Sequence, residues 1–397
     1  MLFRSYVNGA VIGGVAGLQT SFLVDGVDVT EQHQGGTWIE PSIDALQEFS
    51  VTQNAYSAEF KRAGGSFNAT TKSGTNKLHG NVFEFLRNDA LDSRAFFAIT
   101  RAVLKRSQFG GTFGGPVVVP HLYNGKDKTF FFLSYQGMRL RQGSNSNSTV
   151  PSAAERGGNF SAAGLNTIYD PLTTVGTSRS PFPNKIIPTA RLSQQMLFFL
   201  PYIPLPNTSL GTAVYSPNSR LRREEVIARV DQQINSANRL FVRWSYVDNR
   251  EGDPAAFPAL GTATLSGLAD NVDVALTSTV RRSMVNEFRY NYLVGNYRSI
   301  AYFQGTNFNQ LAGITGLEGA QDNSIATLPN FSFSGYAGFS GQAGDGRPKF
   351  QNRVVNELTD NLTWIKGRHI VKFGVDMRYF SILFTDTRTH VGSWSFI

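Results

Sequence analysis

Stretches in which apolar and polar residues alternate dominate this chain. Near the C-terminus, Val371 and Phe373 fall on one side of such a stretch, while Lys372 and Asp376 fall on the other. Residues two apart in a β-strand share a face, so this pattern predicts strands with one apolar and one polar side. A sheet of such strands belongs either to a soluble sandwich or to a barrel that sits in lipid.

Nine stretches of this kind follow residue 78, and each is about ten to fourteen residues long. That length is close to the ~9–11 residues of a tilted transmembrane strand and exceeds the ~5–6 residues of an ordinary strand. The predicted strands are 79–88, 107–118, 128–141, 222–233, 239–248, 271–281, 284–295, 353–366 and 369–382.

The connections between these strands alternate between short and long. Short turns are expected at 119–127, 234–238, 282–283 and around Gly367, and long connections at 89–106, 142–221, 249–270 and 296–352. This alternation is typical of an up-and-down outer-membrane barrel, which has brief periplasmic turns and large external loops. A one-sided soluble sheet is the alternative, but a sandwich mixes its connection lengths. We also expect Trp244, Tyr246, Trp364 and Tyr379 to lie near strand ends, as an aromatic girdle.

The first 77 residues have a different character. A short strand, Ser21–Val24, precedes an Asp25-Gly26 turn, and Pro41–Leu46 is expected to form a helical turn with Ile43 and Leu46 on one face. Strands at 48–52 and 66–71 follow, and the polar residues 72–76 end the segment. The sequence therefore predicts a small α/β unit over 1–77 and a larger all-β unit over 78–397.

Composition narrows the class of protein. The 397 residues include no cysteine, charged residues make up 17%, and the formal net charge is +8. The cations are scattered and form no basic run, which argues against a nucleic-acid partner. A positively lined interior or an anionic lipid surface accounts for the charge equally well.

No apolar run approaches the ~18 residues of a membrane helix, so any crossing is by strands. Glycines interrupt the apolar start at 1–17, so we expect the export signal elsewhere.

The sequence shows no motif or residue spacing that is typical of an enzyme site. The five histidines are far apart in the chain, with none of the spacings of metal ligands: His33, His79, His121, His369 and His390. No nucleophile elbow and no phosphate-binding loop is present. We therefore expect no enzyme, no metal and no cofactor.

Several segments together resemble TonB-dependent receptors, particularly the Oar-like group. They are Phe-Leu-Val-Asp-Gly-Val-Asp at 22–28, Ile-Asp-Ala-Leu-Gln-Glu-Phe at 43–49, Ala-Gly-Gly-Ser-Phe-Asn-Ala-Thr-Thr-Lys-Ser-Gly at 63–74, His-Gly-Asn-Val-Phe-Glu-Phe at 79–85, Gln-Phe-Gly-Gly-Thr-Phe-Gly-Gly-Pro at 108–116 and Lys-Thr-Phe-Phe-Phe at 128–132. The residues of the plug motif are Asp25, Gly26, Gly64, Gly65, Thr71, Lys72 and Gly74.

The resemblance implies a plug folded inside a barrel of about 22 strands, in the outer membrane of a Gram-negative bacterium. Its partners would be outer-membrane lipid, an unknown ligand and the periplasmic TonB protein, which energises uptake. Measured against that pattern, we expect this chain to be a fragment: the C-terminal part of a plug, then nine or ten barrel strands, with a tenth strand beginning near residue 394. An adhesin or structural surface protein without active transport is the alternative.

Charged residues on the polar strand faces are the candidate lumen-facing residues. They are Arg229, Asp231, Arg243, Glu287, Arg289, Lys372, Asp376 and Arg378. They either line a permeation path or form a ladder of opposite charges that holds the wall and the plug together. The second interpretation is favoured, because cross-strand pairs of opposite charge stabilise sheets by ~0.2–1 kcal/mol each. Ligand specificity is then expected in the long external loops.

Overall fold

A computed structural model describes most of the chain. The described residues are 20–31, 36–53, 65–94, 101–143, 146–162, 164–316, 323–340, 348–387 and 390–396. The predicted histidine His33 and the plug-motif residue Gly64 lie outside these ranges, as does the apolar start at 1–17.

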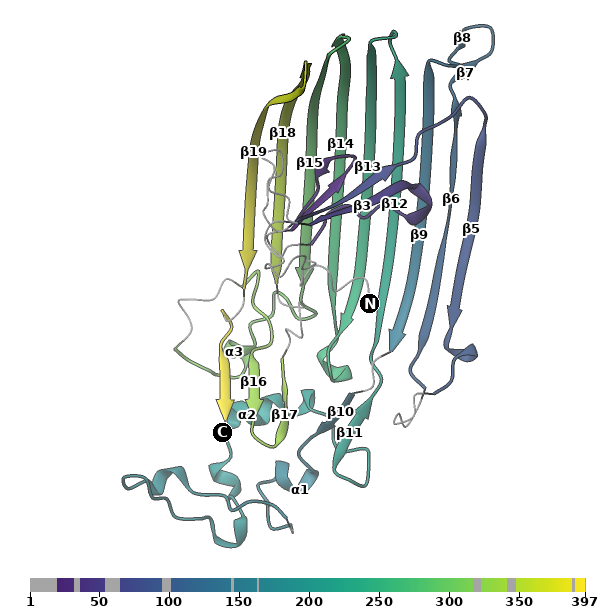
Figure 1. The fold of residues 1–397 in the computed structure, drawn as a ribbon. Coiled ribbons are helices and arrows are strands. Elements are labelled where there is room, and N and C mark those ends of the chain that lie inside the picture. The colour runs from purple at the N-terminus through teal and green to yellow at the C-terminus, as the bar shows by residue number, and fades with distance from the viewer. Residues whose placement is uncertain are drawn as a thin grey trace.

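A single nine-stranded sheet forms the body of the molecule (Figure 1). Its strands follow one another in chain order, and each neighbouring pair is antiparallel. They are β5 (His79–Asn88), β6 (Leu104–Pro116), β9 (Thr129–Gly143), β12 (Asn218–Gln233), β13 (Asn238–Pro254), β14 (Thr262–Arg281), β15 (Met284–Ile300), β18 (Lys349–Lys366) and β19 (His369–Asp386). All nine predicted strands and the mainly-β fold class are confirmed. The sheet is open between β19 and β5, so the barrel is not closed within the described residues.

The strands extend further than predicted on the side of the long connections. The predicted long loop at 249–270 is wrong, because β13 continues to Pro254, β14 begins at Thr262, and Asp253 still pairs with Ala263. Backbone hydrogen bonds to a neighbouring strand sustain the ladder after the apolar pattern has ended. Most of the predicted aromatic girdle, namely Trp244, Tyr246 and Tyr379, therefore lies within the strands rather than near their ends, whereas Trp364 does lie near an end.

A smaller four-stranded sheet, here called the N-terminal sheet, lies across one face of the large sheet (Figure 1). It consists of β1 (Thr20–Val24), β2 (Val27–Asp28), β3 (Leu46–Gln53) and β4 (Gly65–Thr71) in the order β2-β1-β4-β3, with β1 and β4 parallel. The predicted helical turn is present as η3 (Ile43–Ala45). Its buried residue is Ala45, whereas Ile43 is 86% exposed, so the predicted apolar face is wrong.

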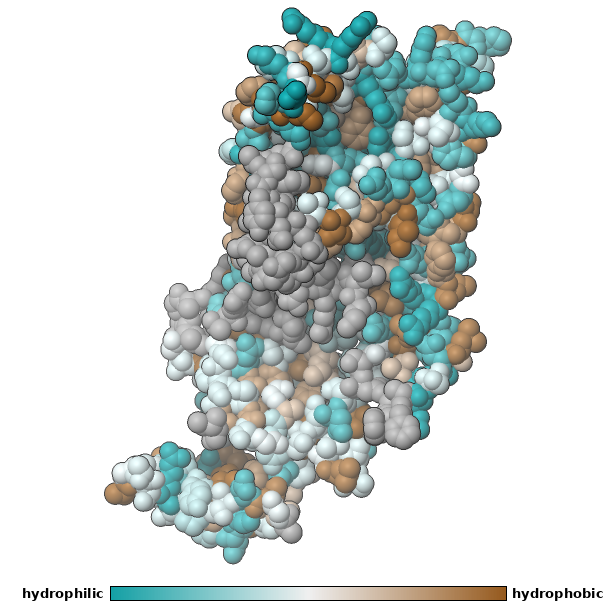
Figure 2. Space-filling model, viewed as in Figure 1, coloured by the Kyte–Doolittle hydropathy of each residue, from teal (hydrophilic) through white to brown (hydrophobic). Residues whose placement is uncertain are grey.

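We call the face of the large sheet that meets the N-terminal sheet the inner face, and the opposite one the outer face. Along β13, Phe241, Arg243 and Ser245 are buried on the inner face, while Trp244 and Tyr246 lie on the outer face. In the middle of this strand a charged side chain, Arg243, thus turns inward while the aromatic rings of Trp244 and Tyr246 turn outward, the reverse of a soluble protein. Figure 2 shows hydrophilic residues gathered at the short-turn end of the sheet.

The long connections form a compact unit at the other end of the sheet, here called the loop module (Figure 1). Its elements are β10 (Ser146–Thr149), α1 (Ala153–Arg156), η5 (Pro171–Thr173), η6 (Pro183–Lys185), η7 (Thr189–Arg191), α2 (Gln194–Phe199), η8 (Leu200–Tyr202), β11 (Thr212–Tyr215), η9 (Pro258–Leu260), α3 (Phe308–Leu311), β16 (Asn330–Phe333), β17 (Tyr336–Phe339) and β20 (Ser393–Phe396). The remaining short elements are η4 (Asp89–Leu91), β7 (Val118–Val119) and β8 (Tyr123–Asn124).

The prediction that a tenth barrel strand begins near residue 394 is wrong for the described residues. β20 pairs with β16 in parallel, within the loop module and apart from the large sheet. Aromatic stacking favours this pairing, because the ring of Trp394 lies 5.2 Å from that of Phe331, and Phe396 lies 5.3 Å from Phe333. None of the described helices is long and apolar enough to cross a bilayer.

Candidate functional site

The centre of the site is the Asp25-Gly26 turn of the N-terminal sheet. Both residues have positive φ angles, 51° and 86°, as the predicted tight turn requires. The backbone N–H of Thr71 donates to Asp25 Oδ1 and the Thr71 hydroxyl donates to Oδ2, each over 2.8 Å. These two bonds from β4 fix the carboxylate so that it faces the wall of the large sheet.

Three arginines from three wall strands close on this turn, and we call them the arginine cluster: Arg229 of β12, Arg243 of β13 and Arg289 of β15. Arg243 forms an ion pair of 2.5 Å with Asp25, and Arg229 lies 3.4 Å from it. Arg289 donates to the backbone carbonyl of Asp25. A side chain at Gly26 would press on Arg289, because a Cβ there would lie 3.2 Å from Nη1.

Carboxylates on the wall balance the arginine cluster. Asp273 is fully buried, 3.9 Å from Arg243 and 3.6 Å from Arg289, and neither of its oxygens accepts a hydrogen bond from a described residue. Asp231 pairs with Arg229 over 2.8 Å and also accepts from Ser73 of the N-terminal segment over 2.7 Å. Buried ion pairs of this kind add little net stability, but removing one partner is costly.

Further polar contacts extend the interface along the inner face. Asp28 pairs with Arg378 over 3.1 Å, and Arg378 pairs with Glu357 over 3.1 Å. Near η3, the backbone N–H of Ser42 donates to Glu225 over 2.7 Å, and its hydroxyl lies 3.4 Å from that of Ser134. The N-terminal sheet is therefore bound to the wall by charged and polar groups at several separate points.

A small apolar contact accompanies these polar ones. Trp38 is buried against the wall together with Val24, Val29 and Leu293. Gly295 of β15 is required there, since a Cβ at this position would lie 2.6 Å from the Trp38 ring. Apolar burial thus supplies shape complementarity at the interface, while the arginine cluster supplies its charged centre.

The structure brings together only part of the predicted lumen-facing set. Arg229, Asp231, Arg243, Arg289 and Arg378 contact the N-terminal segment or lie beside those that do. The other three are more open: the Glu287 side chain is 41% exposed and pairs with Arg289 over 3.2 Å, while Lys372 and Asp376 of β19 are exposed.

Two further plug-motif residues, Lys72 and Gly74, fix the end of the N-terminal segment. Lys72 donates from Nζ to the carbonyl of Asp44 over 2.8 Å. Gly74 passes so close to β9 that a Cβ would lie 2.3 Å from the carbonyl oxygen of Phe131. Gly65 begins β4.

Sequence reasoning missed Asp273 and Asn271, although the alternation within 271–281 places both on one face. Asn271 accepts a hydrogen bond of 2.8 Å from Arg243 and so positions that guanidinium. The Ser152-x-x-Glu155 spacing was a second available signal, because it forms a capping box at α1. No sequence signal joins Glu155 to Tyr336, 181 positions later.

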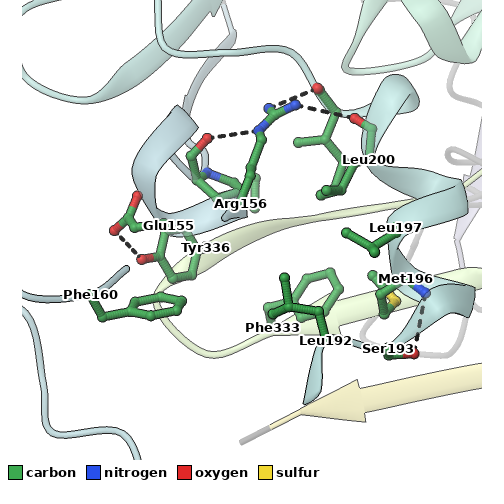
Figure 3. Close-up of a pocket in the computed structure, with 13 residues that line it drawn as sticks. Glu155, Arg156, Phe160, Leu192, Ser193, Met196, Leu197, Leu200, Phe333 and Tyr336 are labelled. Atoms are coloured by element: carbon green, nitrogen blue, oxygen red, sulfur yellow. Dashed lines mark hydrogen bonds between the residues drawn. The ribbon is translucent and has the colours of Figure 1, made fainter. Parts of the chain in front are cut away.

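A cavity of about 270 Å³ lies in the loop module (Figure 3). Its walls are mostly apolar, with contributions from Met196, Leu197, Leu200 and Phe333. The guanidinium of Arg156 lies on the cavity wall, but its hydrogen bonds go to the backbone carbonyls of residues 151, 200, 203 and 204. The cavity therefore suits an uncharged, apolar chemical group.

A hydrogen bond of 2.6 Å from the Tyr336 hydroxyl to Glu155 forms one side of this cavity (Figure 3). Partial burial raises the pKa of Glu155, but the bonds from Tyr336 and Ser152 outweigh it, and the pKa lies below its ordinary value. Burial and then the bond to Glu155 raise the pKa of Tyr336. At neutral pH the neutral Tyr336 hydroxyl therefore donates to the ionised Glu155 carboxylate. Among the described residues, no cluster of three or more acidic or histidine side chains could hold a metal ion.

Comparison with known proteins gives consistent results. Residues 70–397 match the family model described as an outer membrane beta barrel domain. An alignment over 136 residues, which covers 32% of this chain and 12% of the other protein, shows 29% identity to the TonB-dependent transporter Oar of Myxococcus xanthus. The predicted resemblance to TonB-dependent receptors is confirmed.

Two solved structures share the fold. The outer membrane transporter YddB of Escherichia coli matches 93% of this chain and 41% of its own, with a TM-score of 0.51 and 9% identity. A mutant of the ferric enterobactin receptor PfeA of Pseudomonas aeruginosa matches 93% of this chain and 42% of its own, with a TM-score of 0.50 and 13% identity. The chain thus spans less than half the length of each of these proteins.

Proposed function

Because this chain belongs to the family of outer membrane beta barrel domains, we propose that it is part of a transporter that takes up a ligand with energy from TonB. The protein lies in the outer membrane of a Gram-negative bacterium, and the proteins to which it is similar are named transporters and receptors. In this proposal residues 1–77 are the C-terminal part of a plug, and residues 78–397 are part of the barrel with its external loops.

The observation that carries the proposal is the arginine cluster around Asp25. A plug must stay closed at rest and yet shift when pulled, so its contacts need to be exchangeable for water. Ion pairs and hydrogen bonds meet this requirement, because each charged partner regains its hydration when the pair opens. An entirely apolar interface would lose that compensation and would resist displacement.

The proposal assigns different roles to the charged residues of the inner face. Arg229, Asp231, Arg243, Arg289 and Arg378 hold the plug, since each lies in or beside a contact with the N-terminal segment. Glu287, Lys372 and Asp376 are more exposed, and we assign them to the path that opens when the plug shifts. Outer-membrane lipid, TonB and one small ligand are the partners.

Ligand capture is assigned to the loop module. Its cavity lies between α1, α2 and the β16–β17 turn and presents apolar walls with a polar side at Tyr336 (Figure 3). A pocket of that character orients a ligand by burying one apolar group while the rest of the ligand faces the lumen.

Uptake is tested by depletion of small molecules from the medium. Cells that express the protein, cells that lack it and expressing cells without TonB are compared by mass spectrometry of the spent medium. We expect a compound that only the expressing cells with TonB remove. Depletion that is equal with and without TonB would contradict energised transport, and depletion in none of the strains would favour a surface protein without transport.

A further inference from the structure

One carboxylate of the loop module has no cationic partner. Glu155 of α1 accepts a hydrogen bond from the Tyr336 hydroxyl at Oε1 and another from the backbone N–H of Ser152 at Oε2, each over 2.6 Å. A carboxylate can accept about four such bonds. Within the part of the chain that the structure describes, no lysine, arginine or histidine lies within ion-pair distance of Glu155. Its lowered pKa keeps the group ionised at neutral pH, so an uncompensated negative charge remains at this position.

This negative charge lies at the edge of the apolar cavity of about 270 Å³. Glu155 is half-buried, and Figure 3 shows it beside Tyr336 at one end of the cavity, with Met196 and Leu197 at the other. Partly buried charges in proteins are normally paired, because an unpaired one loses hydration without compensation. A positive group at the Glu155 end would supply that compensation and would leave the apolar walls to the rest of the bound molecule.

The neighbouring Arg156 does not supply the positive group. Its guanidinium donates four hydrogen bonds to backbone carbonyls, one from Nε, one from Nη1 and two from Nη2. A guanidinium has five N–H groups, so only one is left for any other acceptor. Figure 3 shows the guanidinium directed away from Glu155 and towards Leu200. Arg156 therefore holds the backbone around α1 and η8, and it does not make the cavity a site for anions.

The aromatic residues of the cavity also favour a positive group. Phe160, Phe333 and Tyr336 contribute three rings to the lining. The face of an aromatic ring attracts a cation that lies within about 6 Å of its centre. Met196 adds a flexible thioether side chain, which adapts to apolar groups of different shapes. The lining thus favours positive charge together with an apolar group, without requiring one exact shape of that group.

We infer that this cavity binds an amphipathic cation, an organic molecule whose apolar group fills the cavity while its protonated amine pairs with Glu155. The hydrogen bond from an ammonium group to a carboxylate is charge-assisted and therefore stronger than one between neutral groups. An anionic molecule of the same shape would be repelled by Glu155, and a neutral one would leave the carboxylate without a cation. The inference deepens the ligand capture proposed above and rests on it, since it names the chemical class of the ligand.

The test compares three small probes that share a phenyl ring and differ in charge: 2-phenylethylamine, 2-phenylethanol and 3-phenylpropanoate. The protein is extracted from outer membranes into a non-ionic detergent and equilibrated with each probe by dialysis, and uptake by detergent alone is subtracted. At neutral pH we expect the amine to bind at least about tenfold more tightly than the alcohol, and the propanoate to bind most weakly. Equal binding of amine and alcohol, absence of amine binding, or tighter binding of the propanoate would each overturn the inference.

Variants assign the charge recognition to Glu155. Glu155→Gln removes the charge, keeps the shape of the side chain, and should weaken amine binding about tenfold without changing that of the alcohol. The control Asp170→Asn, which removes another carboxylate of the loop module, should bind the amine like the unaltered protein. Equal amine affinities in these two variants would overturn the role of Glu155. Tyr336→Phe keeps the carboxylate and should retain the amine, whereas a tenfold loss would show that the hydroxyl is the polar contact and overturn the pairing with Glu155.

A further variant tests the cavity without altering the carboxylate. Ala337→Leu narrows the cavity and should weaken binding of both amine and alcohol, while unchanged amine binding would overturn the location. It replaces Glu155→Gln if that variant does not fold, as judged by heat-modifiable gel mobility and limited proteolysis. Binding is measured without TonB. Amine binding without TonB-dependent depletion would therefore contradict transport alone, and TonB-dependent depletion without amine binding would contradict the ligand class alone.

Discussion

The loop module and the arginine cluster are both buried, yet they are built from opposite chemistry. Phe199 in the loop module is completely buried, and its ring lies 5.0 Å from that of Phe331 and 6.0 Å from that of Phe339. Arg243, equally buried, instead contacts Asp25 and Asn271. When aromatic rings separate, water offers no comparable contact. When an ion pair separates, each charged group regains its hydration.

Under the proposed transport function, this difference lets one chain combine a part that stays fixed with a part that shifts. Long connections that lie far apart in the sequence are held as one body by their shared apolar core. The N-terminal sheet is held in place by directional charges, which fix its position without making separation from the wall prohibitive. Disrupting each region should therefore have different consequences.

The largest effect is expected from Phe199→Ala. The substitution leaves a cavity in the aromatic core and should lower the free energy of unfolding of the loop module by about 3–5 kcal/mol. Limited proteolysis and thermal unfolding would report this loss, while the heat-modifiable mobility of the large sheet should not change. Leu210→Ala, at a position 85% exposed, is the control. Equal protease resistance of the two variants would contradict a single packed loop core.

Arg243→Met should have the next largest effect, about 3 kcal/mol on the docking of the N-terminal sheet, because it leaves Asp25 and Asp273 without their shared cation. The measurement is hydrogen exchange of the β1–β4 amides. Adding Asp25→Asn should recover part of the loss, since the two changes act on one ion pair. Strict additivity of the two substitutions would contradict a coupled cluster. Arg87→Met, on an exposed ion pair, serves as the control.

A smaller effect, about 1 kcal/mol, is expected from Tyr336→Phe, which removes the hydrogen bond to Glu155. The pKa of Glu155 is lowered in the folded state, so its contribution to stability is present above the ordinary carboxyl pKa and is lost as the pH falls through the folded pKa. The pKa of Tyr336 is raised, so its contribution is lost as the pH rises through that raised pKa. The variant should lose most of this dependence in thermal unfolding measured against pH, and an unchanged profile would contradict the assignment.

Arg191→Gln should have the smallest effect. Its ion pair with Asp170, of 2.6 Å, is at the surface of the loop module, where water and salt compete with it. We expect an unchanged melting temperature at moderate ionic strength. A shift as large as that of Tyr336→Phe would show that surface pairs contribute to the loop module.

The alternation of apolar and polar residues made the large sheet predictable. Residues such as Val371 and Phe373 indicate the lipid-facing side of their strand without reference to the rest of the fold. The Asp25-Gly26 turn was predictable for a similar reason, since its chemistry is local. The contacts of Asp25 with Arg243 and Arg289 join positions more than 200 residues apart and depend on how the N-terminal sheet docks. Likewise, β20 pairs within the loop module because of aromatic partners that its own four residues do not reveal.

The central claim is that the N-terminal sheet separates from the wall when TonB acts. Ser42 tests it directly, because its side chain is buried at the interface, 3.4 Å from the Ser134 hydroxyl, and the chain contains no native cysteine. The measurement is the rate at which a maleimide labels Ser42→Cys in cells with and without TonB, with oxidised Ser42→Cys/Ser134→Cys as the locked control. We predict fast labelling only with TonB and none in the locked protein. Equal rates with and without TonB would contradict the account.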